Sequence, residues 1–257
     1  ENVLTFKEAP DYETKNSYSI TLSLTDGTEV VTKDVTITII DINDAAPVFT
    51  SESTFSAAEN QTAIGTVTAT DPEGDSFSFS ISGTELSITS EGVLSFTSAP
   101  DYETRATYTA TVTVVDTEDN SATQDITINV TNVNDNSPVF TSNATFSVEE
   151  NKTAIGTVTA TDADGDAATF SISGTELEIT SAGILSFISA PDYETKTTYT
   201  ATVTASDGTN TTTQDITINV TNVNDVAPEF TSEATFSPDE NQTSIGTVSA
   251  TDAEGDD

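Results

Sequence analysis

The chain has 257 residues and a formal net charge of -37, because 43 Asp and Glu residues stand against only 6 Lys and Arg. This deficit of basic residues excludes nucleic acid as a natural partner and disfavours binding to an anionic membrane surface. Cysteine and histidine are absent, which excludes disulfides, cysteine-type zinc sites, a Ser-His-Asp triad and a cysteine nucleophile. So acidic a chain is either a disordered tail or a folded protein whose carboxylates meet a cation. Its 12 Phe, 6 Tyr and regular apolar alternation indicate that it folds.

A unit of about 90 residues recurs along the chain. The motif Ala-Pro-Asp-Tyr-Glu-Thr begins at Ala9, Ala99 and Ala190, and Asn-Asp-x-x-Pro begins at Asn43, Asn134 and Asn224. Their phase predicts the C-terminal half of a repeat over 1–46, complete repeats over 47–137 and 138–227, and the N-terminal part of a further repeat over 228–257.

Within each unit the apolar residues alternate with a period of two. In the first complete copy, alternation with Ser, Thr or Asn runs in chain order over 77–81, 108–114 and 126–130. This pattern is typical of strands with one buried face and one wet face. Glycines at roughly 8–10 residue intervals separate the short strands. We therefore predict an all-β protein of tandem two-sheet β-sandwiches.

Acidic residues recur at the same phase of every copy. They form a Glu before Asn (Glu59, Glu150, Glu240), an acidic loop after a strand (beginning at Asp71, Asp162, Asp252), an Asp-Tyr-Glu motif (beginning at Asp11, Asp101, Asp192) and a junction motif (beginning at Asp41, Asn132, Asn222). A further Asp ends the long strand that begins with Tyr, at Asp26, Asp116 and Asp207. This fixed phase distinguishes these residues from acids that serve only solubility.

Such clusters predict a bound cation, because unneutralised acids repel by about 1 kcal/mol per close pair even in water. Oxygen-only ligands select a hard ion, and the many candidate ligands favour Ca²⁺ over Mg²⁺. An EF-hand at Asp162–Asp166 is rejected. Gly165 is fourth in the loop instead of sixth, the twelfth residue is Ser173, and strands flank the motif.

This series of motifs resembles the extracellular repeat of cadherins over the whole chain. The resemblance implies seven-strand Greek-key β-sandwiches of Ig-like type arranged end to end, with up to about three Ca²⁺ ions at each junction between repeats. It implies as metal ligands, at the first junction, Asp11, Glu13, Asp41, Asn43 and Asp44 with Asp71, Glu73 and Asp116. At the second junction it implies Glu59, Asp101, Glu103, Asn132 and Asp135 with Asp162, Asp164 and Asp207, and Asn134 for the ion nearest the following repeat. At the third it implies Glu150, Asp192, Glu194, Asn222, Asn224 and Asp225 with Asp252 and Glu254.

Some positions depart from the family pattern. Asn132 and Asn222 stand where the family has an acid, which removes one charge from each junction, and Glu73 and Glu254 replace Asp. Trp is absent, so adhesion by exchange of a tryptophan between cells is not supported. The absence of Cys and the close similarity of the copies make the chain resemble a bacterial surface or secreted adhesin array more than a vertebrate cadherin.

The expected function is a calcium-rigidified extracellular spacer and adhesion array, secreted or attached to a cell surface, and not an enzyme. Its expected partners are calcium and, through domains outside this chain, other surface proteins or glycans. No run of about 18 apolar residues exists for membrane insertion, and the first four residues do not resemble a signal peptide, so we expect an internal or processed segment. An array of calcium-dependent polysaccharide-binding modules is the alternative. Paired carboxylates can cleave glycosides, but a pair repeated in every copy at a junction indicates a structural role.

Overall fold

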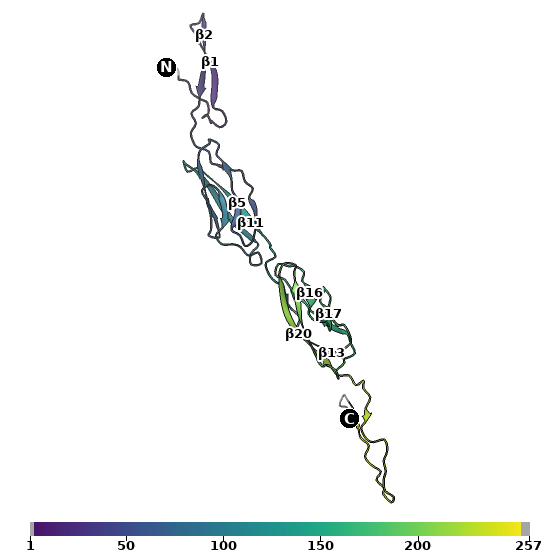
Figure 1. Ribbon diagram of the computed structural model, residues 1–257. Coiled ribbons are helices and arrows are strands. Elements are labelled where there is room, and N and C mark those ends of the chain that lie inside the picture. Colours follow the sequence, from purple (N-terminus) through teal and green to yellow (C-terminus); the bar gives the residue numbers. More distant parts are fainter. Residues whose placement is uncertain (1–2, 253–257) are drawn as a thin grey trace. The chain divides into compact units, whose positions relative to one another are not determined.

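The structure, a computed structural model, describes residues 3–252 and divides between Val133 and Asn134 into two compact units (Figure 1). Every regular element of the described residues is a β-strand, which confirms the prediction made from the apolar alternation. The first unit holds a β-hairpin and a complete β-sandwich. The second holds another complete sandwich and a short strand pair.

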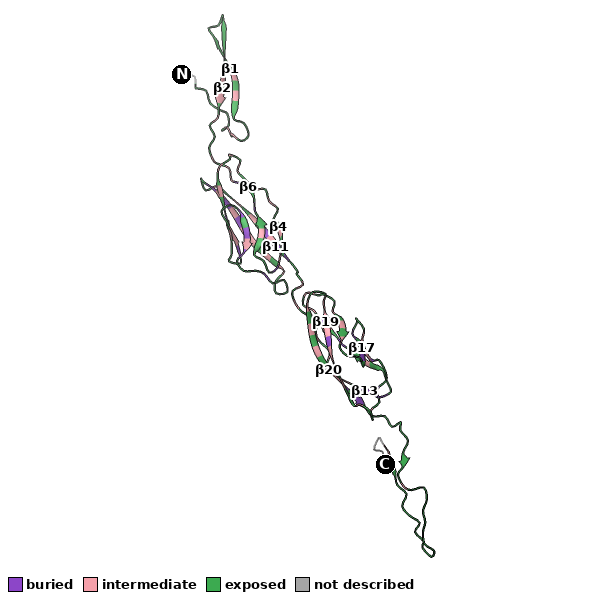
Figure 2. Cartoon of the chain, in the orientation of Figure 1, coloured by how far each residue is buried: buried purple, intermediate pink, exposed green. Residues whose placement is uncertain are grey.

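The hairpin joins β1 (Ser17–Thr25) to β2 (Val30–Thr38) in antiparallel register, with Ser17 opposite Thr38. Its apolar face is open, since Leu24 is 74% exposed whereas Val114, at the same phase of the next copy, is fully buried. Figure 2 shows this contrast: β1 and β2 carry only exposed and intermediate residues, while buried residues fill the sandwiches.

The first sandwich follows the linker. Its elements are β3 (Val48–Phe49), β4 (Thr54–Ala58), β5 (Ala63–Thr66), β6 (Ala69–Thr70), β7 (Phe77–Ile81), β8 (Leu86–Ile88), β9 (Val93–Phe96), β10 (Thr107–Asp116) and β11 (Ser121–Thr131). One sheet has the order β4-β11-β10-β7, and opposite it lie the sheet β5-β9-β8 and the pair β3-β6. When β3 with β4 and β5 with β6 are counted as interrupted single strands, the sandwich has seven strands.

The core of this sandwich lies between the two sheets. Val112 and Ile126 enter it from the four-stranded sheet, and Leu94 and Phe96 enter it from the opposite one. Mainly Thr and Ser occupy the alternate, outward positions of β10 and β11. Thr111 Oγ1 there donates across the strands to Asp125 Oδ1 at 2.7 Å. The sequence pattern therefore determines which face of each strand is buried, because successive side chains point to opposite faces.

The second sandwich repeats this arrangement. Its elements are β12 (Val139–Phe140), β13 (Thr145–Glu149), β14 (Ala154–Thr157), β15 (Ala160–Thr161), β16 (Thr169–Ile172), β17 (Leu177–Ile179), β18 (Ile184–Phe187), β19 (Thr198–Ser206) and β20 (Thr211–Thr221). Its sheets are β13-β20-β19-β16, β14-β18-β17 and β12-β15. A last pair, β21 (Glu229–Phe230) with β22 (Ala250–Thr251), follows it.

One glycine is required beside the paired strands β5 and β9 of the first sandwich. Gly92 has φ +88°, and a Cβ there would lie 2.2 Å from the Val67 carbonyl oxygen. The Val67 N–H donates to the Gly92 carbonyl at 2.9 Å, so the two backbones are in direct contact. Gly183 has the same place against Val158 in the second sandwich.

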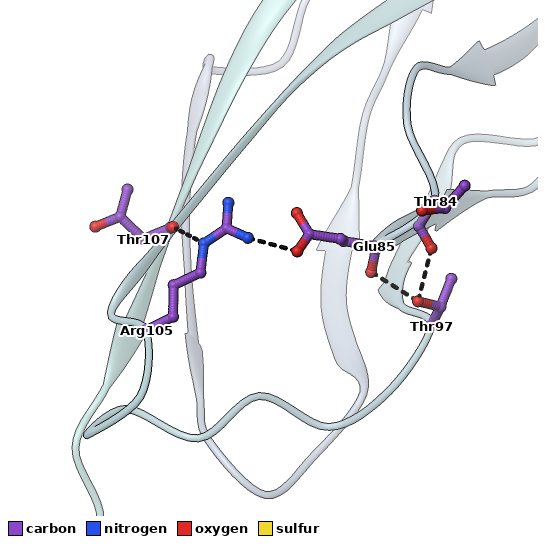
Figure 3. Close-up of polar contacts among 5 residues, drawn as sticks. All are labelled: Thr84, Glu85, Thr97, Arg105 and Thr107. Carbon is purple, nitrogen blue, oxygen red and sulfur yellow. Dashed lines mark hydrogen bonds and ion pairs between the residues drawn. The ribbon is translucent and has the colours of Figure 1, made fainter.

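A single basic residue links strands in the first sandwich (Figure 3). Arg105 Nη1 pairs with Glu85 Oε1 at 2.5 Å, and Arg105 Nε donates to the Thr107 carbonyl oxygen at 2.9 Å. The guanidinium also lies 4.1 Å from the centre of the Tyr108 ring. In the second sandwich, Lys196 makes the equivalent contacts with Glu176 and Tyr199.

Candidate metal centre

Three acidic side chains from separate segments meet in the first unit. Glu13 belongs to the half-repeat, Asp44 lies in the linker before β3, and Glu73 lies in the loop after β6. One carboxylate oxygen of each lies within 4.8 Å of the others. The Ala45 N–H donates to Glu73 Oε1 at 3.3 Å, which joins the linker directly to the loop.

The electrostatics of this cluster are those of crowded carboxylates. The backbone N–H of Glu13 lowers the pKa of its own carboxyl, but burial and the carboxylates of Asp11, Glu73 and Asp41 raise it more. The net pKa of Glu13 therefore lies above its ordinary value. Like charges disfavour ionisation unless an opposite charge is present, so the cluster is suited to a cation.

The Glu that precedes Asn is buried in both complete copies. Glu59 is 3% exposed, and its two carboxylate oxygens accept the N–H groups of Tyr102 and Val133, each at 2.7 Å. Glu150 is 2% exposed and accepts the N–H groups of Tyr193 and Val223 in the same manner. This Glu therefore ties the Asp-Tyr-Glu turn to the end of the last strand of its own repeat, using hydrogen bonds alone.

The acidic loops are preorganised by backbone hydrogen bonds. Asp71 Oδ1 accepts the N–H groups of Glu73 and Asp75, each at 3.0 Å. Gly74 has φ +82°, a left-handed conformation that favours glycine. In the second unit, Asp164 Oδ2 accepts the N–H groups of the linker residues Asp135 (3.0 Å) and Asn136 (2.8 Å). The linker is thereby fixed to the loop of the repeat that follows it.

The first acid of each Asp-Tyr-Glu motif caps its own turn. Asp101 Oδ2 accepts the Thr104 hydroxyl at 2.8 Å, and Asp101 Oδ1 accepts the Thr104 N–H at 3.2 Å. The Thr104 hydroxyl and N–H hold the pKa of Asp101 below its ordinary value. Asp11 with Thr14, and Asp192 with Thr195, repeat the turn. The sequence patterns did not indicate these threonines as partners of the acids.

The Asp that ends the long strand meets an asparagine that was not among the predicted site residues. Asn120 Nδ2 donates to Asp116 Oδ2 at 2.9 Å and to Asn43 Oδ1 at 3.0 Å. Burial raises the pKa of Asp116, but hydrogen bonds from the Asn120 side chain and from the Glu118 and Asn120 N–H groups bring it below its ordinary value. In the second unit, Asn210 Nδ2 donates to Asn134 Oδ1 at 2.8 Å. The Asn follows the Asp by four residues in the first sandwich and by three in the second, so the repeat phase that identified the acids did not identify it.

The predicted ligands are therefore gathered unevenly. In the first unit, besides the cluster of Glu13, Asp44 and Glu73, a carboxylate oxygen of Glu59 lies within 4.8 Å of one of Glu103. The second unit has two clusters by the same criterion: Glu150, Asp192 and Glu194, and Asp162, Asp164 and Asp166, the last of which was not a predicted ligand.

Other predicted ligands lie outside these clusters. Asp225 accepts the Asn151 side-chain amide, and Asn132, Asn222 and Asn224 are exposed on the linkers. Asp41 and Asp252 belong to none of the clusters found among the described residues, and Glu254 lies outside those residues.

The donor set fits a hard cation. In the first unit, Asp71 Oδ2 and Glu73 Oε2 are buried without a hydrogen-bond partner, and so are Asp162 Oδ2 and Asp207 Oδ2 in the second. A buried carboxylate oxygen without a partner is costly unless a cation compensates it. Carboxylate and amide oxygens without His or Cys are the ligands that Ca²⁺ prefers. The residues present are thus suited to hold Ca²⁺.

The two sandwiches and their acidic motifs define tandem cadherin-like repeats. A family model described as a bacterial Ig domain matches residues 43–129 and 134–221. These matches cover more than half of the chain, which therefore belongs to the bacterial Ig domain family. The predicted fold class and the resemblance to cadherin repeats are confirmed.

Several animal cadherins are similar in sequence. The chain is 35% identical over 231 residues to the protocadherin-like wing polarity protein stan of Drosophila melanogaster. This match covers 77% of this chain and 6% of that protein. It is 30% identical over 258 residues to protocadherin Fat 4 of Mus musculus, and this match covers 88% of this chain and 5% of that protein. The chain thus spans only a small part of the length of these curated relatives.

Solved structures of cadherin repeats share the fold. The protocadherin gammaB7 EC3-6 cis-dimer structure matches with a TM-score of 0.70 at 25% identity, over 96% of this chain and 70% of that one. The crystal structure of mouse cadherin-23 EC22-24 matches with a TM-score of 0.62 at 23% identity, over 84% of this chain and 78% of that one.

The comparisons also bear on activity and location. Cadherin-like adhesion repeats are a non-enzymatic family, which agrees with the expectation that the chain is not an enzyme. Cadherin and bacterial Ig domains are typically extracellular. Within residues 3–252, no helix has the length and apolarity needed to cross a membrane.

Proposed function

We propose that this chain is a calcium-binding part of an extracellular repeat array, in which Ca²⁺ at each junction fastens one repeat to the next. The main support for this function is that the carboxylates of Glu13, Asp44 and Glu73 lie close together. These acids come from a half-repeat, a linker and the following repeat, and their oxygens lie within 4.8 Å of one another. A cation held by all three would bind only the folded arrangement of the three segments, and would stabilise it.

The ligand set extends to the other junctions by the phase of the repeat. Glu103, Asp135 and Asp164 correspond to Glu13, Asp44 and Glu73. The supporting geometry lies within each unit: Glu59 and Glu103 are close in the first, and Asp164 holds the backbone of Asp135 in the second. When bound, Ca²⁺ would neutralise these carboxylates. The chain's own hydrogen bonds would set where the carboxylates stand.

In this function the chain comprises four portions of repeats, over residues 1–46, 47–137, 138–227 and 228–257. The predicted ligands are the candidate ligands at each junction, for up to about three ions. The role as a stiff spacer that carries an adhesive domain outside this chain rests on the short linkers. Residues 39–46 separate β2 from Pro47, and residues 132–137 separate β11 from Pro138; neither segment is a flexible Gly/Ser tether.

Calcium titration of the full chain tests the proposal, with a charge-matched pair of variants. Asp44→Asn removes a charge from the cluster, whereas Glu52→Gln removes one from an exposed residue outside it. Extracellular modules bind Ca²⁺ at roughly 10⁻⁴–10⁻³ M, and a site at ten times its dissociation constant adds about 1.4 kcal/mol. We expect calcium to raise the unfolding temperature of the parent chain and of Glu52→Gln.

We expect Asp44→Asn to bind calcium more weakly at one junction, as measured by calorimetry, while the unfolding temperature in chelator hardly changes. The proposal is wrong if calcium and chelator give the same unfolding temperature for the parent chain, or if the two variants lose affinity equally.

The polysaccharide-binding alternative has less support. Such a site needs exposed aromatic residues gathered on one face, whereas the outward positions of β10 and β11 carry mainly Ser and Thr.

A further inference from the structure

The hairpin that follows the strand-end Asp differs between the two sandwiches by one residue. Asp116 and Asn120 are separated by three residues, and Asp207 and Asn210 by two. Asp119 has φ +68° in the longer hairpin, and Gly208 has φ +101° in the shorter one. The two Asn side chains consequently reach different oxygens.

In the longer hairpin, the Asn120 amide bridges the linker and the strand end. Its Nδ2 lies 3.0 Å from Asn43 Oδ1, 3.3 Å from the Asn43 carbonyl oxygen and 2.9 Å from Asp116 Oδ2. The other Asp116 oxygen, Oδ1, accepts the N–H groups of Glu118 and Asn120, each at 2.9 Å. Asp116 is 7% exposed, so both oxygens of a buried carboxylate are satisfied by donors of the chain itself.

In the shorter hairpin, the short hydrogen bonds of the amide go to the linker, although the Asn210 and Asn134 side chains also lower the pKa of Asp207. Asn210 Nδ2 donates to Asn134 Oδ1 at 2.8 Å and to the Asn136 carbonyl oxygen at 2.9 Å. Asp207 Oδ1 accepts the N–H groups of Thr209 and Asn210, but Asp207 Oδ2 is buried without a hydrogen-bond partner.

A cation and the Asn120 amide would compete for the same oxygens. Ca²⁺ sits at about 2.3–2.6 Å from each oxygen ligand, whereas a hydrogen-bond donor nitrogen lies at about 2.9 Å. An ion that bridged Asn43 Oδ1 and Asp116 Oδ2 would therefore have to enter the space of Asn120 Nδ2. The amide donates hydrogens to both oxygens without adding charge.

Resting on the proposed calcium function, we propose that the Asn120 amide takes the place of a cation between Asn43 and Asp116, whereas Asp207 keeps an oxygen free for an ion in the next repeat. The linker before the first sandwich is thus fastened at this point without metal. The two junctions differ in the number of ions they hold, and the length of one hairpin determines the difference.

Ion counting by native mass spectrometry of the full chain at saturating calcium tests this assignment. Asn120→Ala frees the oxygens of Asn43 and Asp116, so this variant should bind one ion more than the parent chain. Asn210→Ala is the matched control, and its count should not rise, because Asp207 already has a free oxygen. In chelator, Asn120→Ala should unfold at a lower temperature than the parent chain.

An independent measurement does not depend on the stability of a variant. In NMR spectra of the parent chain, calcium should leave the Asn120 side-chain amide resonances in place and should shift those of Asn210. An Asn120 amide that shifts with calcium, or an unchanged ion count in folded Asn120→Ala, overturns this inference while the calcium function stands. A parent chain that binds no calcium overturns the proposed function instead.

Discussion

Arg105 is the only basic residue of the first complete repeat, and its contacts are directional. The guanidinium pairs with Glu85 and lies over the ring of Tyr108, which itself packs edge-on against Phe96 at 5.1 Å between ring centres. The Arg105 side chain thereby holds the turn before β10 against the opposite sheet.

We expect Arg105→Ala to destabilise this sandwich by about 1 kcal/mol, because exposed cation–π contacts and exposed ion pairs each contribute about 0.5–1 kcal/mol at most. Arg105→Lys should be nearly neutral, since Lys196 makes the same pair of contacts in the second sandwich. Urea unfolding in chelator measures both variants. An equal loss of stability in Arg105→Ala and Arg105→Lys would contradict the role assigned to the positive charge of this side chain.

At the scale of the element, glycines with similar positive φ angles have different neighbours. Gly83 and Gly92 both have positive φ in the first sandwich, but an added Cβ would meet nothing within 4 Å at Gly83. At Gly92 it would meet the Val67 carbonyl oxygen at 2.2 Å.

Gly83→Ala should therefore cost only the conformational strain of an L residue at positive φ, about 1–2 kcal/mol. Gly92→Ala should cost clearly more, because the backbone of Val67 must move. Thermal unfolding gives the sizes, and hydrogen exchange should show the loss of protection for Gly92→Ala around β5 and β9. Similar costs for the two variants would mean that the contact with Val67 relaxes freely.

The strands and their buried faces could be predicted because they depend on local alternation. Residues 108–114 show period two in sequence, and Val112 and Val114 are fully buried in β10. The interruption between β3 and β4 was not predicted, because it depends on which sheet each segment joins.

Candidate ligands could be identified from their repetition, but their partners could not. The Asn120 amide meets Asn43 from 77 positions away, and only the folded chain brings the two together. The ligand roles themselves remain a prediction.

At the scale of the whole molecule, charge is the dominant property. With a net charge of -37, we expect the repeats to repel one another when no cations are bound. Calcium removal is therefore expected to widen the range of distances between repeats.

Small-angle scattering in calcium and in chelator measures that range. Surface repulsion is screened over about 8 Å at 0.15 M salt, so added NaCl alone should not restore the calcium-bound distribution if the ions are site-bound. A distribution that is identical in calcium and chelator, or that NaCl restores completely, would argue against junction sites.

The pairing of the first and last strands of each sandwich has a mechanical consequence. β4 and β11 run parallel, with Thr54 opposite Thr127 and Ala58 opposite Thr131. Apart from the two-residue strand β3, which pairs with β6, the chain enters at the start of β4 and leaves at the end of β11. Tension along the chain therefore pulls β4 and β11 in opposite directions along their length. The inter-strand hydrogen bonds are then loaded together in shear, and cannot open one after another as in a hairpin pulled from its two ends. β13 and β20 have the same parallel pairing, so the same shear loading applies to the second sandwich.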